Sequence, residues 1–531
     1  MHTINKVMIR SNAILSLVFR SQGRARLAMI GTLLCLACSS SMTSARAQTA
    51  GSTIIVNSAA DGLFVIVDPR FPAPPPPCTL RDAITAANTN RPVAGCAAGS
   101  PSPAVDTILF NIGTGTPVIN VRTQLPPIVE RVNINGGSFG ATRVEIEGTR
   151  ASFTAALLGQ HAHGLFLATG DSTIRNMVIN RFNGNGIVMT TFTGAPIGDF
   201  TPPTITDPSI PAEPPCFARP AEPDCPPGSG TGGPVLPPIG GAGARNQIMG
   251  CFIGTDATGT LALGNGSGLD YAGIVTDTDL HTIGGPTLSD RNVISGNFGH
   301  GLILGGRGQW VRGNFIGTDV SGNVALGNQF DGINIAGGQF STAMGAIGAN
   351  TLSTDPLCGL LPGNDRPQCG NRIAFNGRNG INAGFNRYAI LSNSIFSNGS
   401  LGIDVDGPGV TLNAANRSRN FPVMGPCWQL VFDLSLGRFV LNIDVTVDNF
   451  PDQPTTVQIF RNTSCDPSGF GEGEALIKTF TGLRNGRHRI QIPASGGIFT
   501  ATATTTLGTP KTSEFSNCFR AGIGAGNPIC F

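Results

Sequence analysis

The densest group of polar side chains in this 531-residue sequence is formed by Asp277, Asp279 and His281, which are spaced two residues apart. If the repeating units described below stack in register, this group lies opposite the region of Arg307. Carboxylates, an imidazole and a guanidinium can all hydrogen-bond to sugar hydroxyls. These four residues are therefore the glycan-binding candidates of the chain. The alternative is that they are solvated side chains of a surface loop, which is the commoner role of such residues.

The sequence does not support a catalytic assignment, and no catalytic residue is predicted. The tripeptide at 299–301, Gly-His-Gly, also occurs in galacturonan hydrolases of β-helical shape, but the Arg-x-Lys and Asp-Asp elements found with it there are missing. No lysine occurs between residues 48 and 477, which removes a lysine base of the lyase type from that part of the chain. Arginines remain as candidates for such a base: Arg307, Arg312, Arg372 and Arg378.

Two further groups raise the question of a metal ion. Asp256 and Asp319 hold equivalent positions in two copies of one phrase, and each precedes small residues and Gly. Calcium is conceivable there, but a repeated Asp in this setting favours an Asx turn. His161 and His163 alternate, yet no third ligand stands near them in the sequence. No metal site and no cofactor is predicted, with calcium as the open alternative.

Internal repeats indicate the architecture that must position these residues. The stretch Asn314–Asn328 repeats the stretch Cys251–Asn265, 63 residues earlier, as x-Phe-Ile-Gly-Thr-Asp followed by Gly-x-x-Ala-Leu-Gly-Asn. Shorter phrases recur every 22 residues, from Asn292 to Asn314 and from Asn371 to Asn393. A unit of this length with short alternating strands predicts one coil of a β-solenoid.

The alternation within each unit explains how such coils would stack. In Gly332-Ile-Asn-Ile335 the two isoleucines share one face, which predicts an apolar interior that continues from coil to coil. The recurring Asn residues are expected at the bends, where their amides can hydrogen-bond along the stack. Cys251 takes the slot that Asn314 holds in the second copy, so we expect it to be a buried thiol.

Composition and the first residues predict an exported protein. Charged residues make up 12% and the net charge is +2, without a basic run after the first 47 residues, which argues against a nucleic-acid partner. Arg20, Arg24 and Arg26 precede an apolar run, and 45–47 read Ala-Arg-Ala. Residues 1–47 are therefore predicted to be a signal peptide. No transmembrane segment is predicted in the mature chain, which places the protein outside the cell or on its surface, with the periplasm as an alternative.

Cysteines fall in local pairs, as expected of an exported protein. Each of three pairs brackets a loop rich in Pro or Gly, where a disulfide would restrain the chain. A fourth bridge is predicted in the C-terminal part, where Cys427 and Cys530 are left without an assigned pairing. The predicted bridges are Cys78–Cys96, Cys216–Cys225, Cys358–Cys369 and Cys465–Cys518.

The pattern divides the mature chain into three parts. Residues 48–110 are expected to form an N-terminal cap, with a strand followed by a short helix whose Leu80, Ile84 and Ala87 cover the end of the solenoid. Coils are expected over 105–420, interrupted by a Pro- and Gly-rich excursion at 194–243. Residues 421–531 change to alternating strands with turn signals, which predicts a small antiparallel β-sandwich.

A family resemblance sharpens this fold. Cys78-Thr-Leu-Arg-Asp-Ala-Ile84 resembles the Cys-Ser-Leu-Arg-Glu-Ala (CSLREA) motif of bacterial secreted proteins, and the Asn-rich phrases resemble their right-handed parallel β-helix repeats. The segments 465–474 and 512–516 are similar to the immunoglobulin-like module that follows such helices. The resemblance implies an all-β protein, with a pectate-lyase-like right-handed parallel β-helix and then an immunoglobulin-like sandwich. The family carries no settled activity, so no catalytic residue transfers.

Two classes of function remain. The sequence favours a non-catalytic surface or secreted module that binds a polysaccharide or a cell-surface glycan. The alternative is a polysaccharide lyase or glycoside hydrolase acting on an acidic polysaccharide. A groove with three or more carboxylates around one Arg on stacked coils would favour the enzyme, whereas smooth faces would favour binding.

Overall fold

The computed structural model describes residues 50–62, 76–191, 243–336, 345–349, 358, 369–384, 388–405, 407–412, 420–449, 451–505 and 510–522, and the backbone of 529–530. The predicted signal peptide and the predicted 194–243 excursion with Cys216 and Cys225 lie almost wholly outside these residues. Among the described residues, none of the helices has the length and apolarity needed to cross a membrane. The boundaries of the predicted domains remain predictions.

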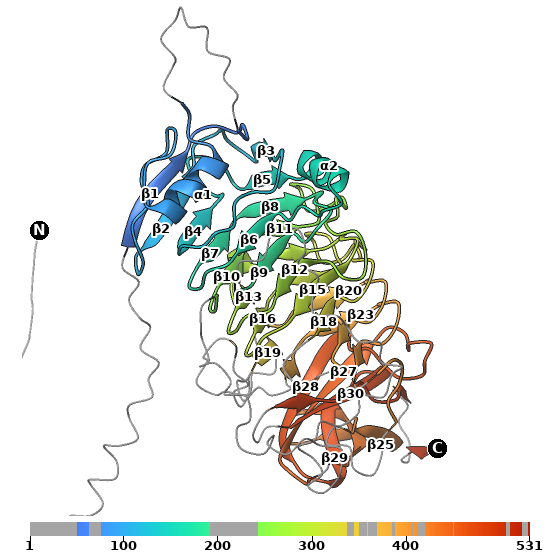
Figure 1. The fold of residues 1–531 in the computed structure, drawn as a ribbon. Helices are drawn as coiled ribbons and strands as arrows, with labels where there is room; N and C mark the ends of the chain where they lie inside the picture. The colour runs from blue at the N-terminus through green and yellow to red at the C-terminus, as the bar shows by residue number, and fades with distance from the viewer. Residues whose placement is uncertain are drawn as a thin grey trace, which may run out of the picture. The chain divides into compact units, whose positions relative to one another are not determined.

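Three parallel sheets form the larger part of the chain, and successive strands pass from one sheet to the next (Figure 1). The first sheet holds β1 (Ala50–Val56), β2 (Val105–Phe110), β4 (Val132–Asn135), β7 (Thr173–Arg175), β10 (Gln247–Met249), β13 (Thr282–Gly284), β16 (Trp310–Arg312), β19 (Gly345–Gly348) and β22 (Tyr388–Leu391). The second holds β3 (Val118–Asn120), β5 (Val144–Glu147), β8 (Met177–Asn180), β11 (Phe252–Ile253), β14 (Val293–Ile294), β17 (Phe315–Ile316), β20 (Arg372–Ala374) and β23 (Ser394–Phe396). The third holds β6 (Leu165–Leu167), β9 (Ile187–Met189), β12 (Ala272–Thr276), β15 (His300–Leu304), β18 (Ile333–Ile335), β21 (Ile381–Asn382) and β24 (Ile403–Asp404).

The predicted parallel β-helix is confirmed, and its interior is built as the alternation requires. Ile248 pairs in register with Ile174 on one side and Ile283 on the other. All three are fully buried and belong to one apolar core that runs along the coils. Each coil alone buries little, so the stacked side chains of neighbouring coils supply the hydrophobic stabilisation.

Ladders of asparagine side chains occupy two of the bends, as predicted. In one ladder Asn292 Nδ2 donates to Asn314 Oδ1 (2.9 Å), Asn314 to Asn371 (3.0 Å) and Asn371 to Asn393 (2.9 Å). Cys251 lies at the start of this ladder, where its backbone N–H donates to Asn292 Oδ1, and its thiol is free and fully buried. Burial raises the pKa of the Cys251 thiol to about 11. The predicted buried thiol is therefore confirmed.

The N-terminal helix caps the core. In α1 (Leu80–Thr89) the Thr79 side chain accepts a hydrogen bond from Asp82 N–H, which satisfies one of the free donors of the first turn. Leu80, Ile84 and Ala87 are buried in the same apolar core as the coils. The predicted helix face is confirmed.

An antiparallel β-sandwich follows the coils, and its two sheets enclose a separate core that includes Trp428 and Phe499. This confirms the predicted sandwich. One sheet holds β29 (Gly486–Pro493), β26 (Arg438–Val447), β25 (Val423–Asp433) and β33 (Ile529–Cys530). The other holds β28 (Ala475–Leu483), β27 (Thr455–Asn462), β30 (Gly497–Thr505) and β31 (Lys511–Thr512), with β32 (Phe519–Ala521) paired to β30.

The sandwich satisfies the open edge of the second sheet of the β-helix. The second asparagine ladder runs through Asn265, Asn297, Asn328 and Asn376 to Asn398. At its end Glu472 of the sandwich takes the place of a further Asn, because its Oε1 accepts from Asn398 Nδ2 (3.2 Å) and from Asn398 N–H (2.9 Å). Gly473 exchanges two backbone hydrogen bonds with Ile395 (2.7 and 2.8 Å).

The other two sheet edges are covered in the same way. At the first sheet Ile390 N–H donates to Thr512 Oγ1 (2.9 Å). Beside the third sheet Val405 N–H donates to Glu514 Oε1 (3.1 Å). Phe515 belongs to the apolar core of the coils. The sandwich is thus the C-terminal cap of the β-helix, which would otherwise end in unpaired backbone groups.

Three of the predicted disulfides are confirmed: Cys78–Cys96, Cys358–Cys369 and Cys465–Cys518. Cys427 is also disulfide-bonded, and Cys530 lies opposite it in the register of β25 and β33.

Candidate functional site

The four predicted glycan-binding residues come together at the bend between the third and first sheets, but they bind one another or other protein groups. Arg307 Nε donates to Asp279 Oδ2 (2.9 Å), so the predicted register is right. His281 is fully buried, and burial lowers its pKa to about 3. Asp277 accepts from Thr190 Oγ1 (2.5 Å), and burial raises its pKa. Contact of these residues with sugar stays a prediction.

The two equivalent aspartates close Asx turns. Asp256 Oδ1 accepts from the backbone N–H groups of Thr260 and Leu261 (both 2.9 Å), and Asp319 Oδ1 accepts from those of Asn323 (3.2 Å) and Val324 (3.1 Å). Burial raises the pKa of Asp256, but the hydrogen bond from the Thr258 hydroxyl, together with those from the backbone, outweighs it and holds the pKa below its usual value. Both carboxylates are therefore held ionised as parts of the loops that they close.

The histidines of interest do not meet as metal ligands. His163 is buried, its pKa is lowered to about 4, and its Nδ1 accepts from Asn185 N–H (2.9 Å). His161 packs against the ring of Tyr271. His300 lies 3.3 Å from Asp331 in the interior. Within the described part of the chain, His, Cys, Asp and Glu form no group of three or more that could hold a metal ion.

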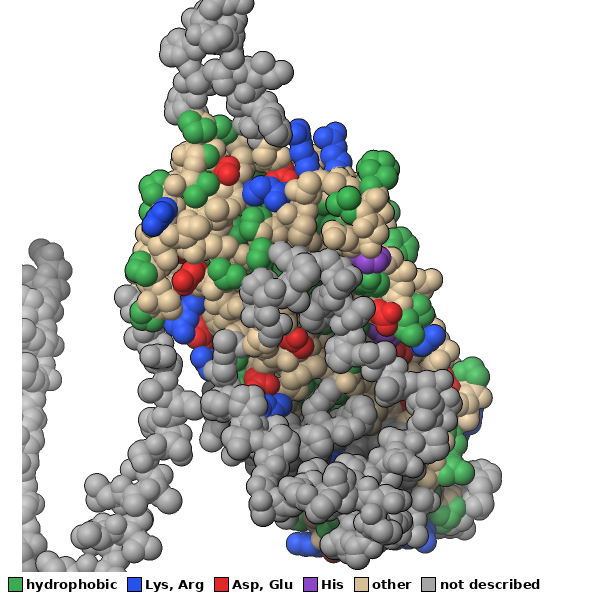
Figure 2. Space-filling view, in the orientation of Figure 1, with side chains coloured by type: hydrophobic (Ala, Val, Ile, Leu, Met, Phe, Trp, Pro, Cys, Tyr) green, Lys and Arg blue, Asp and Glu red, His purple; other side chains and the backbone are tan. Residues whose placement is uncertain are grey.

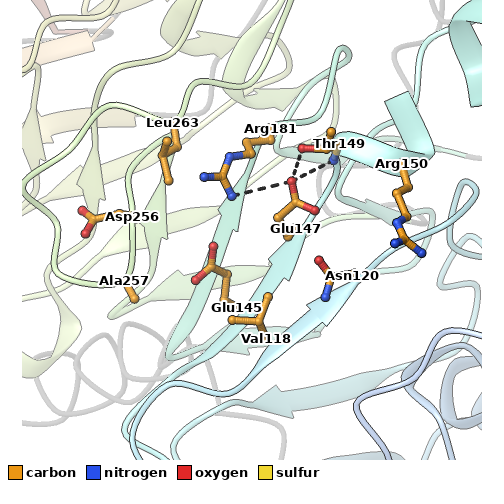
Figure 3. A pocket seen from close by; sticks show the side chains of 10 residues that line it. All are labelled: Val118, Asn120, Glu145, Glu147, Thr149, Arg150, Arg181, Asp256, Ala257 and Leu263. Atoms are coloured by element: carbon orange, nitrogen blue, oxygen red, sulfur yellow. Dashed lines mark hydrogen bonds and ion pairs between the residues drawn. The ribbon is translucent and has the colours of Figure 1, made fainter. Parts of the chain in front are cut away.

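A groove of about 620 Å3 lies on the outer face of the second sheet at β3, β5 and β8 (Figure 3). Alternation places its floor, because Ile119 and Ile146 point into the core while their neighbours point outward. Val118 pairs in register with Glu145, and Asn120 pairs with Glu147. Two glutamates of one strand therefore stand side by side on the face turned away from the core, and only 7% of Glu145 and 6% of Glu147 is exposed.

Both glutamates are oriented by neighbouring side chains. Glu145 Oε1 accepts from Asn180 Nδ2 on the next strand (2.8 Å). Glu147 Oε1 accepts from Thr149 N–H (3.1 Å) and from the Thr149 hydroxyl, and it lies 3.6 Å from Arg181 Nη1. These contacts fix the position of the Glu147 carboxylate in the groove.

Helix α2 (Thr149–Leu157) forms one side of the groove. It begins two residues after Glu147, which places this carboxylate at the positive end of the helix dipole. Arg150 from its first turn also lines the groove (Figure 3). The sequence does not predict this helix, because its large apolar residues do not mark a buried face. Phe153 and Leu157 are 67% and 71% exposed.

The opposite side is the loop after β11, through Asp256, Ala257 and Leu263. A smaller cavity of about 230 Å3 shares Asn120 and Arg150 with the groove and extends it toward Arg122. In the face drawn in Figure 2, acidic and basic side chains are sparse and mixed.

The lining of the groove can both donate and accept hydrogen bonds. Glu145, Glu147 and Asp256 supply carboxylates, Arg150 and Arg181 supply guanidinium groups, and apolar carbons of Val118, Ala257 and Leu263 complete it. This matches the feature that would favour an enzyme: three carboxylates around an Arg on stacked coils. The two glutamates are separated by one residue, or about 6.6 Å along the strand.

Sequence reasoning missed this site. A signal was present in Val144-Glu-Ile-Glu147, because alternation with two carboxylates is unusual in a chain with 12% charged residues. This alternation predicts that the two acidic side chains share one side of the strand. It does not predict which later segments of the chain lie opposite them.

Comparison with known proteins adds little. No protein-family model matches the sequence, and no curated protein matches it. The enzymatically active domain of tailspike protein 4 from bacteriophage CBA120 is similar with a TM-score of 0.16 and 10% identity, over 77% of this chain and 64% of that one. This chain thus spans less than two thirds of the length of the tailspike domain.

Proposed function

We propose that this is an exported glycan-binding β-helix protein whose sugar site is the groove on β3, β5 and β8. The observation that carries the proposal is the lining of that groove, where three carboxylates, two guanidinium groups and Asn120 surround about 620 Å3. Sugar hydroxyls need both donors and acceptors, and the apolar faces of sugar rings pack against carbons such as those of Val118 and Leu263. The volume lies in the range of ordinary ligand sites.

Export is supported by the disulfides. Bridges such as Cys78–Cys96 and Cys465–Cys518 form and persist in oxidising compartments. An exported protein meets glycans of cell surfaces and extracellular matrices, which agrees with the proposed ligand class.

A glycan array followed by calorimetry tests the proposal. Asn120 and Arg150 line both cavities and have no side-chain hydrogen bond to other described residues, so their removal perturbs the fold least. We expect Asn120→Ala to weaken binding by about 2- to 10-fold and Arg150→Ala by about 10-fold or more. Arg438→Ala, on an exposed hairpin of the sandwich, is the matched control. Absence of glycan binding, or equal binding by all variants, would refute the proposal.

Hydrolysis is a second candidate, favoured by one observation. Glu145 and Glu147 stand on the same face of one strand, with backbones about 6.6 Å apart, and a pair of carboxyl groups beside the substrate is what glycoside hydrolysis requires. In such a reaction one carboxyl protonates the leaving glycosidic oxygen, while the other takes a proton from the water that attacks the anomeric carbon.

Release of reducing ends separates hydrolysis from binding alone. We expect Glu145→Gln and Glu147→Gln to retain glycan binding within about 10-fold and to abolish release if the groove is catalytic. A uronate-release assay with and without calcium runs in parallel. Unsaturated products would indicate a lyase instead, and binding without any turnover would leave the groove as a binding site.

A further inference from the structure

Three arginines on the second sheet of the β-helix each lie over a phenylalanine ring. The guanidinium carbon of Arg143 is 3.7 Å from the centre of the Phe252 ring, and that of Arg291 is 4.1 Å from the Phe315 ring. The guanidinium carbon of Arg372 is 4.8 Å from the centre of the Phe396 ring, in the next strand. Stacking on an aromatic ring restricts a long side chain and so holds its charge in place before any ligand arrives.

The register of the strands places Arg143 and Arg291 in equivalent positions. Glu145, Val178, Phe252 and Val293 are successive partners across the second sheet. Arg143 and Arg291 each lie two residues before a member of this row, so they hold the same place in coils three strands apart. At about 4.8 Å per strand their backbones are about 14 Å apart.

The third arginine lies further along the same sheet. Arg372 is the register partner of Phe315, which itself pairs with Val293. It therefore lies two strands beyond Arg291, about 10 Å further along the stack, and is offset from the place of Arg143 and Arg291 by two residues, or about 6.6 Å along the strand. We call Arg143, Arg291 and Arg372 the arginine edge.

Within the described residues, no carboxylate pairs with the arginine edge. This sets it apart from other arginines of the chain, such as Arg175 with Asp290 or Arg245 with Asp171. Nε of Arg143 donates to the Gly250 carbonyl oxygen and Nε of Arg291 to that of Gly313 (both 3.1 Å).

The outer nitrogens of these guanidinium groups have no hydrogen bond to the described part of the chain and are not among its buried unsatisfied atoms. Nε of Arg372 is one of those buried atoms without a partner. Burial of the rest of the side chain lowers the pKa of Arg143 and of Arg291. A partly desolvated cation without a counter-charge is unfavourable, and a bound anion would offset that cost.

We propose that the arginine edge binds a linear acidic glycan that runs along the β-helix axis and carries carboxylate or sulfate groups. A planar guanidinium presents paired N–H donors that match both anions. A polymer with charges at regular intervals can reach cations on several separate coils at once, which a small anion cannot. The net charge of +2 gives no general attraction for nucleic acid. The proposal does not depend on the groove, although the same glycan chain can reach both.

Binding of two acidic polymers tests the proposal. Polygalacturonate supplies carboxylates, chondroitin sulfate supplies sulfates as well, and neutral dextran is the control polymer. We expect the intact protein to bind at least one acidic polymer at 50 mM salt, with affinity that falls as salt rises. We expect the triple variant Arg143→Gln, Arg291→Gln, Arg372→Gln to bind at least about 30-fold more weakly.

Matched variants keep the outcome interpretable. Arg245→Gln removes the same charge from an arginine that is paired with Asp171, and we expect binding within about 2-fold of wild type. If the triple variant does not fold, Arg372→Gln alone replaces it as the test. We expect this single variant to weaken binding about 3- to 10-fold. Asn120→Ala changes only the groove. If Asn120→Ala weakens binding of the acidic polymer and the triple variant does not, the arginine-edge proposal fails while the groove proposal stands. Equal binding by the triple variant, or equally tight binding of single-stranded DNA, would overturn it.

Discussion

Removing the carboxylate of Glu472 should destabilise the C-terminal end of the β-helix. Its Oε1 accepts from Asn398 N–H (2.9 Å) and Asn398 Nδ2 (3.2 Å), and its Oε2 accepts from Ser397 N–H (2.5 Å). Glu472→Ala leaves these three donors of the last coil without a protein partner. Hydrogen bonds to a charged group contribute about 1.5–3 kcal/mol each, and water reaches part of this half-buried site. We therefore expect a loss of about 2–4 kcal/mol in the free energy of unfolding.

Two tryptophans make the location of that loss measurable. Trp310 lies in β16 of the coils, and Trp428 lies in the core of the sandwich. They are the only tryptophans of the chain. Urea unfolding followed by fluorescence in a Trp428→Phe background reports the coils alone. We expect Glu472→Ala to shift this transition to lower urea, and Glu472→Gln, which keeps one acceptor oxygen, to shift it about half as far.

Glu474→Gln is the matched control. Glu474 accepts from the backbone and hydroxyl of Thr463 inside the sandwich, at an exposed site, so the Trp310 transition should move by less than about 0.5 kcal/mol. The reasoning fails if Glu472→Ala leaves the Trp310 transition in place. A shift seen only at Trp428 would mean that Glu472 stabilises the sandwich and does not cap the coils.

Two further predictions concern the interior and the pH dependence of stability. Asn314→Ala should lower the free energy of unfolding in urea by about 2–4 kcal/mol, because Asn292 Nδ2 loses its acceptor and the Ile283 carbonyl loses its donor in the buried bend. The same change at the exposed Asn323 should lower it by less than about 1 kcal/mol. Equal effects of the two changes would contradict a stabilising role of the ladder. Burial, with a smaller contribution from the charge of Asp404, raises the pKa of Glu514 to about 7. The folded state then holds this proton more tightly than the unfolded chain, so stability should fall by up to about 3 kcal/mol as pH rises from about 4.5 to about 7. Glu514→Gln should flatten that slope in pH-dependent thermal unfolding, and an unchanged slope would show that another group carries it.

The coil architecture could be predicted because its determinants are local and repeated. The 22-residue interval between Asn371 and Asn393 is the length of one coil, and their side chains meet at 2.9 Å. Alternation in the C-terminal part predicts the strands of the sandwich, since each face of a strand meets either core or solvent. Two of the bridges, Cys78–Cys96 and Cys358–Cys369, were predictable because each closes a short loop.

The capping role of the sandwich could not be predicted in the same way. Glu472 and Glu514 lie in segments that resemble an immunoglobulin-like module, and nothing in their local pattern marks them as ligands of backbone groups. Their partners, Asn398 and Val405, are 74 and 109 residues away in sequence. Contacts of this kind depend on how two separately folded cores meet.

The candidate site also has a part that the sequence predicts and a part that it does not. The sequence placed Asp279 opposite Arg307 correctly, because both lie in regular coils 28 residues apart. It did not find the groove, because β3, β5 and β8 belong to the first coils, where the spacing between strands is irregular. Glu147 and Arg181 meet across such coils, and the wall at Asp256 comes from much later in the sequence.

The duplicated phrase explains why the groove occurs where it does. In both copies the loop packs over a phenylalanine of the second sheet, and a side chain added at Gly259 or Gly322 would collide with the ring of Phe252 or Phe315. The second loop stacks on the first, since Val320 N–H donates to the Gly259 carbonyl (2.9 Å). Among the described residues, the first loop has no such loop stacked on its N-terminal side, and there it faces the glutamates of β5. The groove therefore lies where the stack of loops begins. Its glutamates come from β5, and the repeated phrase supplies only the loop that forms its opposite side.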